Sequence, residues 1–349
     1  MSHAHRDQPL DALLHPFATG QLRWPSAADI LFLRAREGAA LHGLGVRGLA
    51  TTQPFKPEAE RLQRVGAEAL DEDALPVARY PLVLALPPRQ REEARALLAK
   101  ACAAVAPGGM VVASVANDEG AKSREADLRQ LAGGLTTISK HHCRVSWTRP
   151  DTGFDAALLA QWSSADAPRV QRSADVPGGE FRTRPGVFAW DRVDAASRML
   201  ADALPADLAG RVADFGAGWG YLSMQVLARC PNVVSLDLYE ADARALALAD
   251  DNLGDARVPV HCHWHDVARG VGERFDAIVC NPPFHTGRAS TPALGQQVIE
   301  AAARALKRGG RFYMVANRGL PYEPMLKANF TSFETLTDNN KFRVSKAVR

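Results

Sequence analysis

The chain has 349 residues, of which 46% are hydrophobic and 23% are charged, and it carries a net charge of +3. This length predicts two domains with sizeable cores, and the charge permits a nucleic-acid partner without demanding one. Because no segment reaches the roughly 18 apolar residues of a membrane span, and residues 1–10 lack the apolar core of a signal peptide, we expect no membrane association. The five scattered cysteines form no Cys-x-x-Cys pair, so we expect a reduced, cytoplasmic protein.

The first half alternates predicted strands with a predicted helix. Apolar runs predict strands at residues 28–33, 80–86 and 110–117, and apolar spacing near 3.6 predicts a helix at 92–106. Residues 163–179 are small, polar and turn-forming, which is typical of a linker. We therefore expect one domain at 1–165 and another at 166–349.

The second half contains a glycine-rich turn. After an amphipathic helix predicted at 195–204, a strand beginning at Arg211 runs into Gly216, Gly218 and Gly220, and a helix follows. Glycines at alternate positions allow tight turning and close backbone approach to a ligand, with helix N–H groups behind them. By itself this pattern is equally compatible with a purely structural turn.

Acidic residues follow the next two predicted strands. Glu240 ends the strand at 233–240, about 20 residues beyond the glycines, where a carboxylate can accept from ribose hydroxyls. Asp237 is a rival, but it lies in mid-strand, so we favour Glu240. Asp266 ends the next strand, and its local residues leave open whether it accepts from an adenine amino group or caps a turn.

Three histidines alternate on that same strand. His261, His263 and His265 share one face of it, which invites a zinc site. No matching fourth ligand accompanies them, and a half-exposed strand face is the commoner reason for such a pattern. We expect no metal.

The most informative stretch is Asp276-Ala-Ile-Val-Cys-Asn-Pro-Pro-Phe-His285. Its apolar part predicts a buried strand that Pro282 and Pro283 terminate, so Asn281 lies at a strand's carboxyl end, where open α/β sheets bind ligands. The Asn281 side chain and the Pro282 carbonyl are suited to accept from the N–H groups of an exocyclic base amine. Phe284 is suited to stack on a flipped-out base. The alternative is a strand that merely ends in a proline-rich turn.

The two halves share markers at nearly constant spacing. The spacings are 195, 201, 200 and 199 residues for the pairs Pro87/Pro282, Gly108/Gly309, Asn117/Asn317 and Arg144/Arg343. Such a repeat indicates a duplicated domain. In the first copy Leu86 takes the place of Asn281, and the first loop lacks the glycines, so this copy is expected to be degenerate: an RNA platform, a folding partner, or both.

The order Asp214-x-Gly-x-Gly-x-Gly, then Glu240, Asp266 and Asn-Pro-Pro-Phe resembles class I S-adenosylmethionine-dependent methyltransferases. The sequences Pro185-Gly-Val-Phe, Phe284-His285, Val315-Ala-Asn and Lys341-Phe-Arg-Val are similar to the bacterial ribosomal RNA guanine-N2 methyltransferases, in particular those of the small subunit. Where those proteins have glycine after Leu-Asp-x, this chain has Ala196, which is expected to alter the cofactor-side lid.

The resemblance implies an α/β fold of two tandem Rossmann-like methyltransferase domains and the cofactor S-adenosyl-L-methionine. It implies methyl transfer to guanine N2 in 16S ribosomal RNA. The cofactor would be held by seven residues: Asp214, Gly216, Gly218, Gly220, Glu240, Asp266 and Asn281. The target base would contact Asn281, Pro282, Pro283, Phe284 and His285, and Arg343 is a candidate for phosphate contact.

Other functions compatible with the motifs are methylation of guanine N2 in 23S ribosomal RNA, of adenine N6, or of a protein glutamine amide. A function of another class is non-catalytic RNA binding in ribosome assembly. The intact glycine turn, Glu240 and Asn281 disfavour the last, because a pure binding protein has no need of all three.

Overall fold

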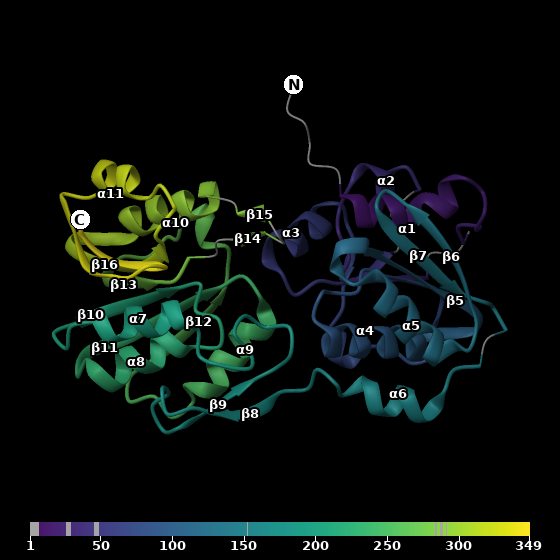
Figure 1. Ribbon diagram of the computed structural model, residues 1–349, viewed down its shortest axis with the longest axis horizontal. Coiled ribbons are helices and arrows are strands. Elements are labelled where there is room, and N and C mark those ends of the chain that lie inside the picture. The colour runs from purple at the N-terminus through teal and green to yellow at the C-terminus, as the bar shows by residue number, and fades with distance from the viewer. Residues whose placement is uncertain are drawn as a thin grey trace. The chain divides into compact units, whose positions relative to one another are not determined.

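The structure is a computed structural model that describes residues 7–25, 29–44, 49–151, 153–282, 285–286, 289–290 and 292–349, with only the backbone of 285–286 and 289–290. The chain divides into two compact units, Met1–Ala167 and Pro168–Arg349. Each unit is an α/β sandwich with helices on both faces of a central sheet (Figure 1).

The first unit is built on a seven-stranded sheet of order β3-β2-β1-β4-β5-β7-β6. Five strands are parallel, and the β5–β7 and β7–β6 pairs are antiparallel. The strands are β1 (Ile30–Leu33), β2 (Leu49–Thr52), β3 (Glu68–Ala69), β4 (Tyr80–Ala85), β5 (Val105–Ala116), β6 (Leu135–Lys140) and β7 (Cys143–Thr148). The helices are α1 (Gln8–Ala18), α2 (Ala39–His42), α3 (Lys56–Arg64), α4 (Arg91–Ala104), α5 (Ala121–Ala132) and α6 (Ala156–Ser163), with 3-10 turns η1 (Glu72–Ala74) and η2 (Asn117–Glu119).

The second unit repeats this arrangement in a sheet of order β12-β11-β10-β13-β16-β18-β17. Its strands are β10 (Ala209–Phe215), β11 (Asn232–Glu240), β12 (Val260–Trp264), β13 (Phe275–Cys280), β16 (Leu306–Asn317), β17 (Ser332–Asp338) and β18 (Phe342–Val348). The helices are α7 (Ala195–Ala203), α8 (Tyr221–Arg229), α9 (Ala243–Asn252), α10 (Pro292–Ala305) and α11 (Glu323–Asn329), with the 3-10 turn η3 (Val267–Arg269). Two short hairpins pair β8 (Arg169–Arg172) with β9 (Glu180–Thr183) and β14 (His285–Thr286) with β15 (Ala289–Ser290).

The identical strand order confirms the duplicated fold, and the strand register shows which residues correspond. Leu33 pairs with Thr52 and Ala85, as Phe215 pairs with Tyr239 and Cys280. Leu86 therefore does correspond to Asn281. Along β5 and β16 the register matches Gly108 with Gly309, and both have a φ of 76°. It matches Arg144 with Arg343. The residue equivalent to Asn117 is Arg318, one position after the expected equivalent Asn317.

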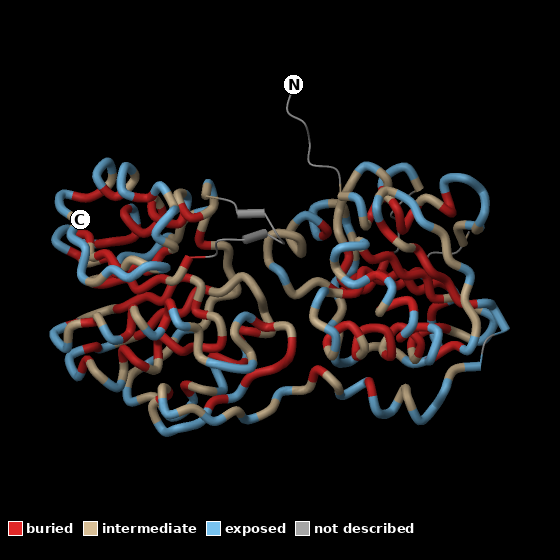
Figure 2. The backbone as a smooth tube through the Cα atoms, in the orientation of Figure 1, coloured by how far each residue is buried: buried red, intermediate tan, exposed pale blue. Residues whose placement is uncertain are grey.

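Both sheets are buried on their two faces, as expected of strands covered by crossover helices. Neighbouring side chains of one strand enter different cores: Phe32 packs on one side of β1 while Leu31 and Leu33 pack on the other. In β10, Val212 likewise packs into one core and Ala213 into the other. Figure 2 shows the buried residues running through the middle of each unit.

The expected linker is partly structured. Its residues 169–172 form β8, which belongs to the second unit as one arm of a hairpin with β9. Pro177, Gly178 and Gly179 are turn residues that suggested an unpaired linker. In the structure they belong to the turn that connects the two strands of this hairpin. Among the described residues no helix is long and apolar enough to cross a membrane, and all five cysteines are free thiols.

Candidate methyl-transfer site

The glycine turn joins β10 to α8. Gly216, Gly218 and Gly220 have φ values of 77°, 57° and 94°. The N–H groups of Gly216 and Ala217 donate to the Tyr239 carbonyl at 2.8 and 3.2 Å, which ties the turn to β11. A Cβ at Gly220 would lie 3.3 Å from the Cα of Ala249, so glycine is needed there for helix packing as well as for its φ.

Glu240 closes the turn from the neighbouring strand. Its Oε2 accepts from the Gly218 N–H at 2.8 Å, and its Oε1 accepts from the Asp242 N–H at 2.8 Å. Desolvation raises the pKa of this half-buried carboxyl. The rival Asp237 is buried, where it accepts from Arg211 and contacts His263 at 3.0 Å. Asp237 therefore binds side chains of neighbouring strands, Arg211 and His263, whereas Glu240 binds the glycine turn.

Asp214 lies in β10, two residues before Gly216, as a fully buried carboxyl. Its Oδ2 accepts from the Ser223 hydroxyl at 2.7 Å, and its Oδ1 has no hydrogen-bond partner among the residues that the structure describes. Burial raises the pKa of Asp214 to about 7, opposed by the Ser223 hydrogen bond and reinforced by the charge of Glu240. An unpaired buried acceptor of this kind is suited to a cationic or hydrogen-bonding ligand group.

Asn281 follows β13 and meets the glycine turn, since a Cβ at Gly216 would lie 3.8 Å from the Asn281 backbone oxygen. Its Nδ2 donates to Asp194 Oδ2 at 3.1 Å and to Ser197 Oγ at 2.8 Å. Its Oδ1 is buried and has no partner within the described part of the chain. The side-chain carbonyl of Asn281 is therefore an acceptor without a partner among the described residues, and it lies at the carboxyl end of β13, as the motif predicted.

Asp194 and Ser197 were not expected among the site residues. Asp194 caps α7 by accepting from the Ser197 N–H at 2.9 Å, and α7 begins beside the site. An aspartate three residues before a serine at a predicted helix start is an N-cap signal, but its contact with Asn281 is set by tertiary packing. Ala196 is buried in the core on the same helix.

A pocket lies between these groups. It is lined by Phe188, Ala189, Asp194, Ser197, Gly216, Ala217, Gly218, Trp219, Tyr221, Leu222 and Asn281. Trp219 donates through Nε1 to the Ala189 carbonyl at 3.3 Å and stacks on Phe181 at a centroid distance of 4.1 Å. Phe188 is 66% exposed. Aromatic residues thus line part of the pocket, and one of them, Trp219, belongs to the glycine turn itself.

The remaining expected site residues lie in different situations. Pro282 is buried next to Asn281, whereas Pro283 and Phe284 lie outside the described residues, and only the backbone of His285 is described. Asp266 caps the turn η3 by accepting from the Ala268 N–H at 3.1 Å, so the capping alternative holds for one oxygen. Arg343 is held by Asp338 at 3.1 Å and by Glu323.

The histidine face of β12 is used in packing contacts. His263 stacks on Tyr239 at 4.4 Å and bonds to Asp237, and His265 Nε2 contacts the Gly270 carbonyl at 2.8 Å. Within the described ranges no three His, Cys, Asp or Glu side chains are placed to hold a metal ion.

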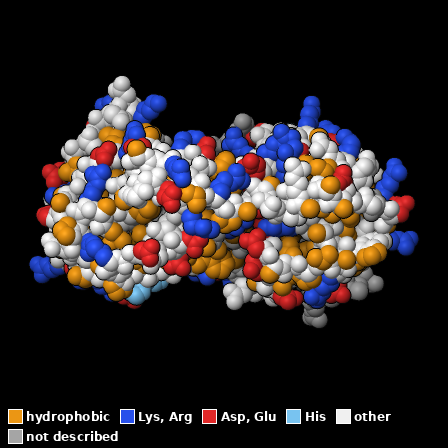
Figure 3. Space-filling model, turned by 90° about the horizontal axis from the view of Figure 1, so that it is seen from below, with side chains coloured by type: hydrophobic (Ala, Val, Ile, Leu, Met, Phe, Trp, Pro, Cys, Tyr) orange, Lys and Arg blue, Asp and Glu red, His pale blue; other side chains and the backbone are white. Residues whose placement is uncertain are grey.

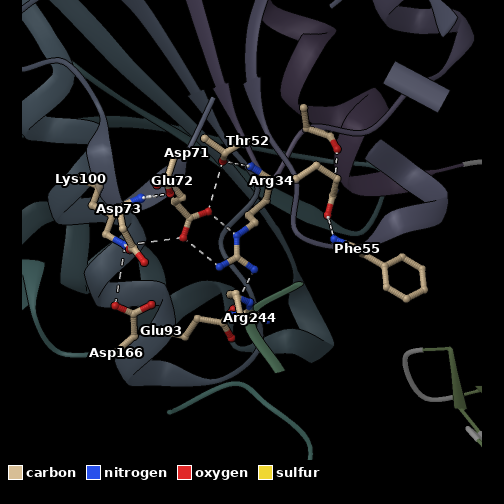
Figure 4. A network of polar contacts seen from close by, with 12 residues as sticks. Arg34, Thr52, Phe55, Asp71, Glu72, Asp73, Glu93, Lys100, Asp166 and Arg244 are labelled. Carbon is tan, nitrogen blue, oxygen red and sulfur yellow. Dashed lines mark hydrogen bonds and ion pairs between the residues drawn. The ribbon is translucent and has the colours of Figure 1, made fainter. Parts of the chain in front are cut away.

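In the first unit the corresponding site is filled by an arginine. Arg34 has the position of Gly216, and its φ of 54° and the Ala35–Thr52 backbone bond of 3.1 Å repeat the geometry of the glycine turn. Its guanidinium binds Glu72 at 2.6 Å and Glu93 at 2.8 Å, as Figure 4 shows. Arg34 is only 9% exposed. With leucine in place of Asn281 as well, the first copy has lost the features of a methyl-transfer site.

The second unit's residues fit S-adenosylmethionine. Three positive-φ glycines form a tight backbone turn, Asp214 Oδ1 is a buried acceptor without a partner among the described residues, and the Glu240 carboxylate lies at the end of the neighbouring strand. Acidic acceptors around a tight backbone turn suit a ligand that combines a sulfonium, an ammonium and a ribose.

The sequence and the fold match known methyltransferases. The methyltransferase small domain family matches residues 178–346. The ribosomal RNA small subunit methyltransferase C of Shewanella baltica is 29% identical over 80% of this chain and 79% of that protein, and that of Psychromonas ingrahamii is 27% identical over 77% and 76%. The solved structure of the 16S rRNA N2 methyltransferase RsmC of T. thermophilus, in complex with AdoMet and guanosine, superposes with a TM-score of 0.83. At 25% identity, that match covers 99% of this chain and 93% of the other.

Proposed function

Because this chain is a class I methyltransferase similar to the RsmC proteins, we propose that it methylates the exocyclic N2 amine of a guanosine in 16S ribosomal RNA, with S-adenosylmethionine as methyl donor. The observation that carries this proposal is the Asn281 side chain beside the glycine turn, with its Oδ1 buried and unpartnered in the described structure. A ribosomal RNA substrate also implies a cytoplasmic location.

The chemical problem is the weak nucleophilicity of the amine, whose lone pair is delocalised into the base. Asn281 Oδ1 and the Pro282 carbonyl are proposed to accept from its two N–H groups, which favours a more pyramidal nitrogen. The cofactor supplies an electrophilic methyl group on a sulfonium. The protein contributes positioning and a dry pocket, and the methylated amine loses its proton to solvent without a strong general base.

The other roles are proposed from position. Gly216, Gly218 and Gly220 would wrap the methionine and ribose parts of the cofactor, with Asp214 below them. Glu240 would accept from the ribose through the lone pairs not used by Gly218 and Asp242.

Asp266 would accept from the adenine amine through the oxygen that does not cap η3. On the substrate side, Phe284 would stack on the guanine, flanked by Pro283 and His285.

The first unit is proposed to support RNA binding or folding of the second. The Arg34 ion pairs with Glu72 and Glu93 support a role other than cofactor binding, because they place a protein side chain at the first unit's counterpart of the glycine turn. In the view of Figure 3, Lys and Arg side chains are interspersed with Asp and Glu on the visible face of each unit. If RNA binds to this face, its recognition is proposed to depend on local contacts more than on a large field of one sign.

The test is transfer of labelled methyl from S-adenosylmethionine to unmethylated small-subunit particles, large-subunit particles and free RNA, with Asn281→Ala as control. We expect N2-methylguanosine in 16S RNA with wild type, and at least a hundredfold slower transfer with the variant. Label in 23S RNA instead would show that the substrate is the large-subunit RNA and not 16S RNA. Cofactor binding without label in any RNA would indicate a protein or DNA substrate, and no cofactor binding would favour a non-catalytic RNA-binding protein.

A further inference from the structure

The start of α7 holds the amide of Asn281 in one orientation. The two hydrogen bonds that Asn281 Nδ2 donates reach Asp194 and Ser197, which lie 87 and 84 positions earlier in the chain. A carboxylate can only accept hydrogen bonds. A flipped amide would set Asn281 Oδ1 against Asp194 Oδ2 at about the 3.1 Å that now separates Nδ2 from it, which brings two acceptors together.

Asp194 is itself held in place. Its Oδ2 accepts from the Ser197 N–H at 2.9 Å as the N-cap of α7, so the same oxygen serves the helix and Asn281. The Ser197 hydroxyl is not needed for that cap, yet it accepts from Asn281 at 2.8 Å and is 8% exposed. Capping alone therefore does not account for both contacts.

This orientation leaves Asn281 Oδ1 directed away from α7. The oxygen is buried and unpartnered in the described structure, and groups of this kind persist where a ligand satisfies them. We propose that Asp194 and Ser197 are positioning residues that lock the Asn281 amide so that its carbonyl faces the target amine. This inference rests on the proposed function and extends its site to the start of α7.

The first test separates positioning from folding. Asp194→Ser retains an N-cap residue but shortens the side chain that reaches Asn281, and Ser197→Ala removes only the hydroxyl. For each variant we expect kcat to fall about tenfold or more, with KM for RNA and Kd for S-adenosylmethionine within about twofold of wild type. The matched control is Asp155→Ser, which alters the N-cap of α6, where Asp155 accepts from the Leu158 N–H at 3.0 Å. It should leave kcat unchanged.

A double-mutant cycle tests whether Asp194 acts through Asn281. In an Asn281→Ala background, Asp194→Ser should reduce single-turnover methyl transfer by less than about twofold further, because the amide that it orients is absent. A full additional tenfold loss would show that Asp194 affects the reaction by another route and would overturn the proposal.

A third measurement does not depend on knowing the substrate. In protein labelled with 15N-asparagine, the Asn281 side-chain signal is assigned by its loss in Asn281→Ala. We expect its NH2 protons to exchange slowly with water in wild type and at least tenfold faster in Asp194→Ser and Ser197→Ala. Unchanged exchange in both variants would overturn the positioning role, even if methyl transfer to 16S RNA is confirmed. Faster exchange without methyl transfer to any RNA would retain the positioning role and reject the proposed function.

Discussion

Arg34 occupies in the first unit the backbone position that Gly216 occupies in the second. Arg34 follows β1 and Gly216 follows the corresponding strand β10, with positive φ values of 54° and 77°, and the next N–H group donates to the neighbouring strand in each case. The backbone of the second unit's glycine turn is thus repeated in the first unit, where the residue at the position of the first glycine carries a guanidinium that is paired with two carboxylates.

Arg34→Ala should destabilise the first unit by about 3–5 kcal/mol, because it removes the guanidinium that lies 2.8 Å from the buried Glu93 and 2.6 Å from the largely buried Glu72, whose pair with Lys100 is longer, at 3.7 Å. Urea unfolding provides the free energy of unfolding. The control is Arg36→Ala, which removes a more exposed pair with Asp7 at 3.2 Å and should cost no more than about 1 kcal/mol. Equal losses in the two variants would contradict the importance of the buried network.

Gly220→Ala should weaken cofactor binding and destabilise the second unit by about 1–3 kcal/mol. The new Cβ would meet Ala249 at 3.3 Å in a residue whose φ is 94°. Calorimetry with S-adenosylmethionine and thermal unfolding measure the two effects. Gly272→Ala is the matched control, since its Cβ would meet no atom within 4 Å and its φ is not positive. A cofactor affinity within twofold of wild type in Gly220→Ala would remove this glycine from the proposed cofactor site.

The pH dependence of stability should include a contribution from Asp214. Its pKa of about 7 in the folded protein exceeds its ordinary value of 3.8, so the folded state retains a proton that the unfolded state releases. This contribution is fully present below pH 4 and is lost as the pH rises through 7, by up to about 4 kcal/mol. Asp214→Asn should abolish it.

The measurement for Asp214 is urea unfolding of wild type and Asp214→Asn at pH 5 and pH 8. We expect the variant to gain stability relative to wild type at the higher pH. A constant difference between the two proteins would show that Asp214 does not titrate in this range.

Arg343 tests the role of the C-terminal basic residues in RNA binding. Since Asp338 and Glu323 already hold its guanidinium, we choose Arg343→Gln, which adds no third carboxylate to the cluster. If Arg343 contacts phosphate, RNA binding weakens and the slope of log K against log salt flattens by about 0.7–0.9. Arg311→Gln is the control: Arg311 pairs with Asp207 and lies towards the other end of the β16–β18 strand pair, so the slope should be unchanged. The same slope in both variants would remove Arg343 from the interface.

The sequence by itself determined the elements whose pattern is local. Alternating apolar runs and helical spacing predicted strands near β1, β4, β10, β11 and β13, since each must be buried on a sheet covered by helices. The glycine turn and Asn281 were placed at the carboxyl edge because turn residues mark where parallel strands end. Spacing of the repeat also identified Leu86 as the counterpart of Asn281, and the register confirms it.

Tertiary structure alone decided the contacts between distant segments. The bonds from Asn281 to Asp194 and Ser197, the Arg34 pairs with Glu72 and Glu93, and the carboxylates around Arg343 each join side chains brought together by packing. Residue spacing carries no record of such contacts, because they depend on how helices and loops pack around the sheet. For this reason the motif located Asn281, the proposed acceptor for the target amine, whereas its hydrogen bonds to Asp194 and Ser197 became evident only in the fold.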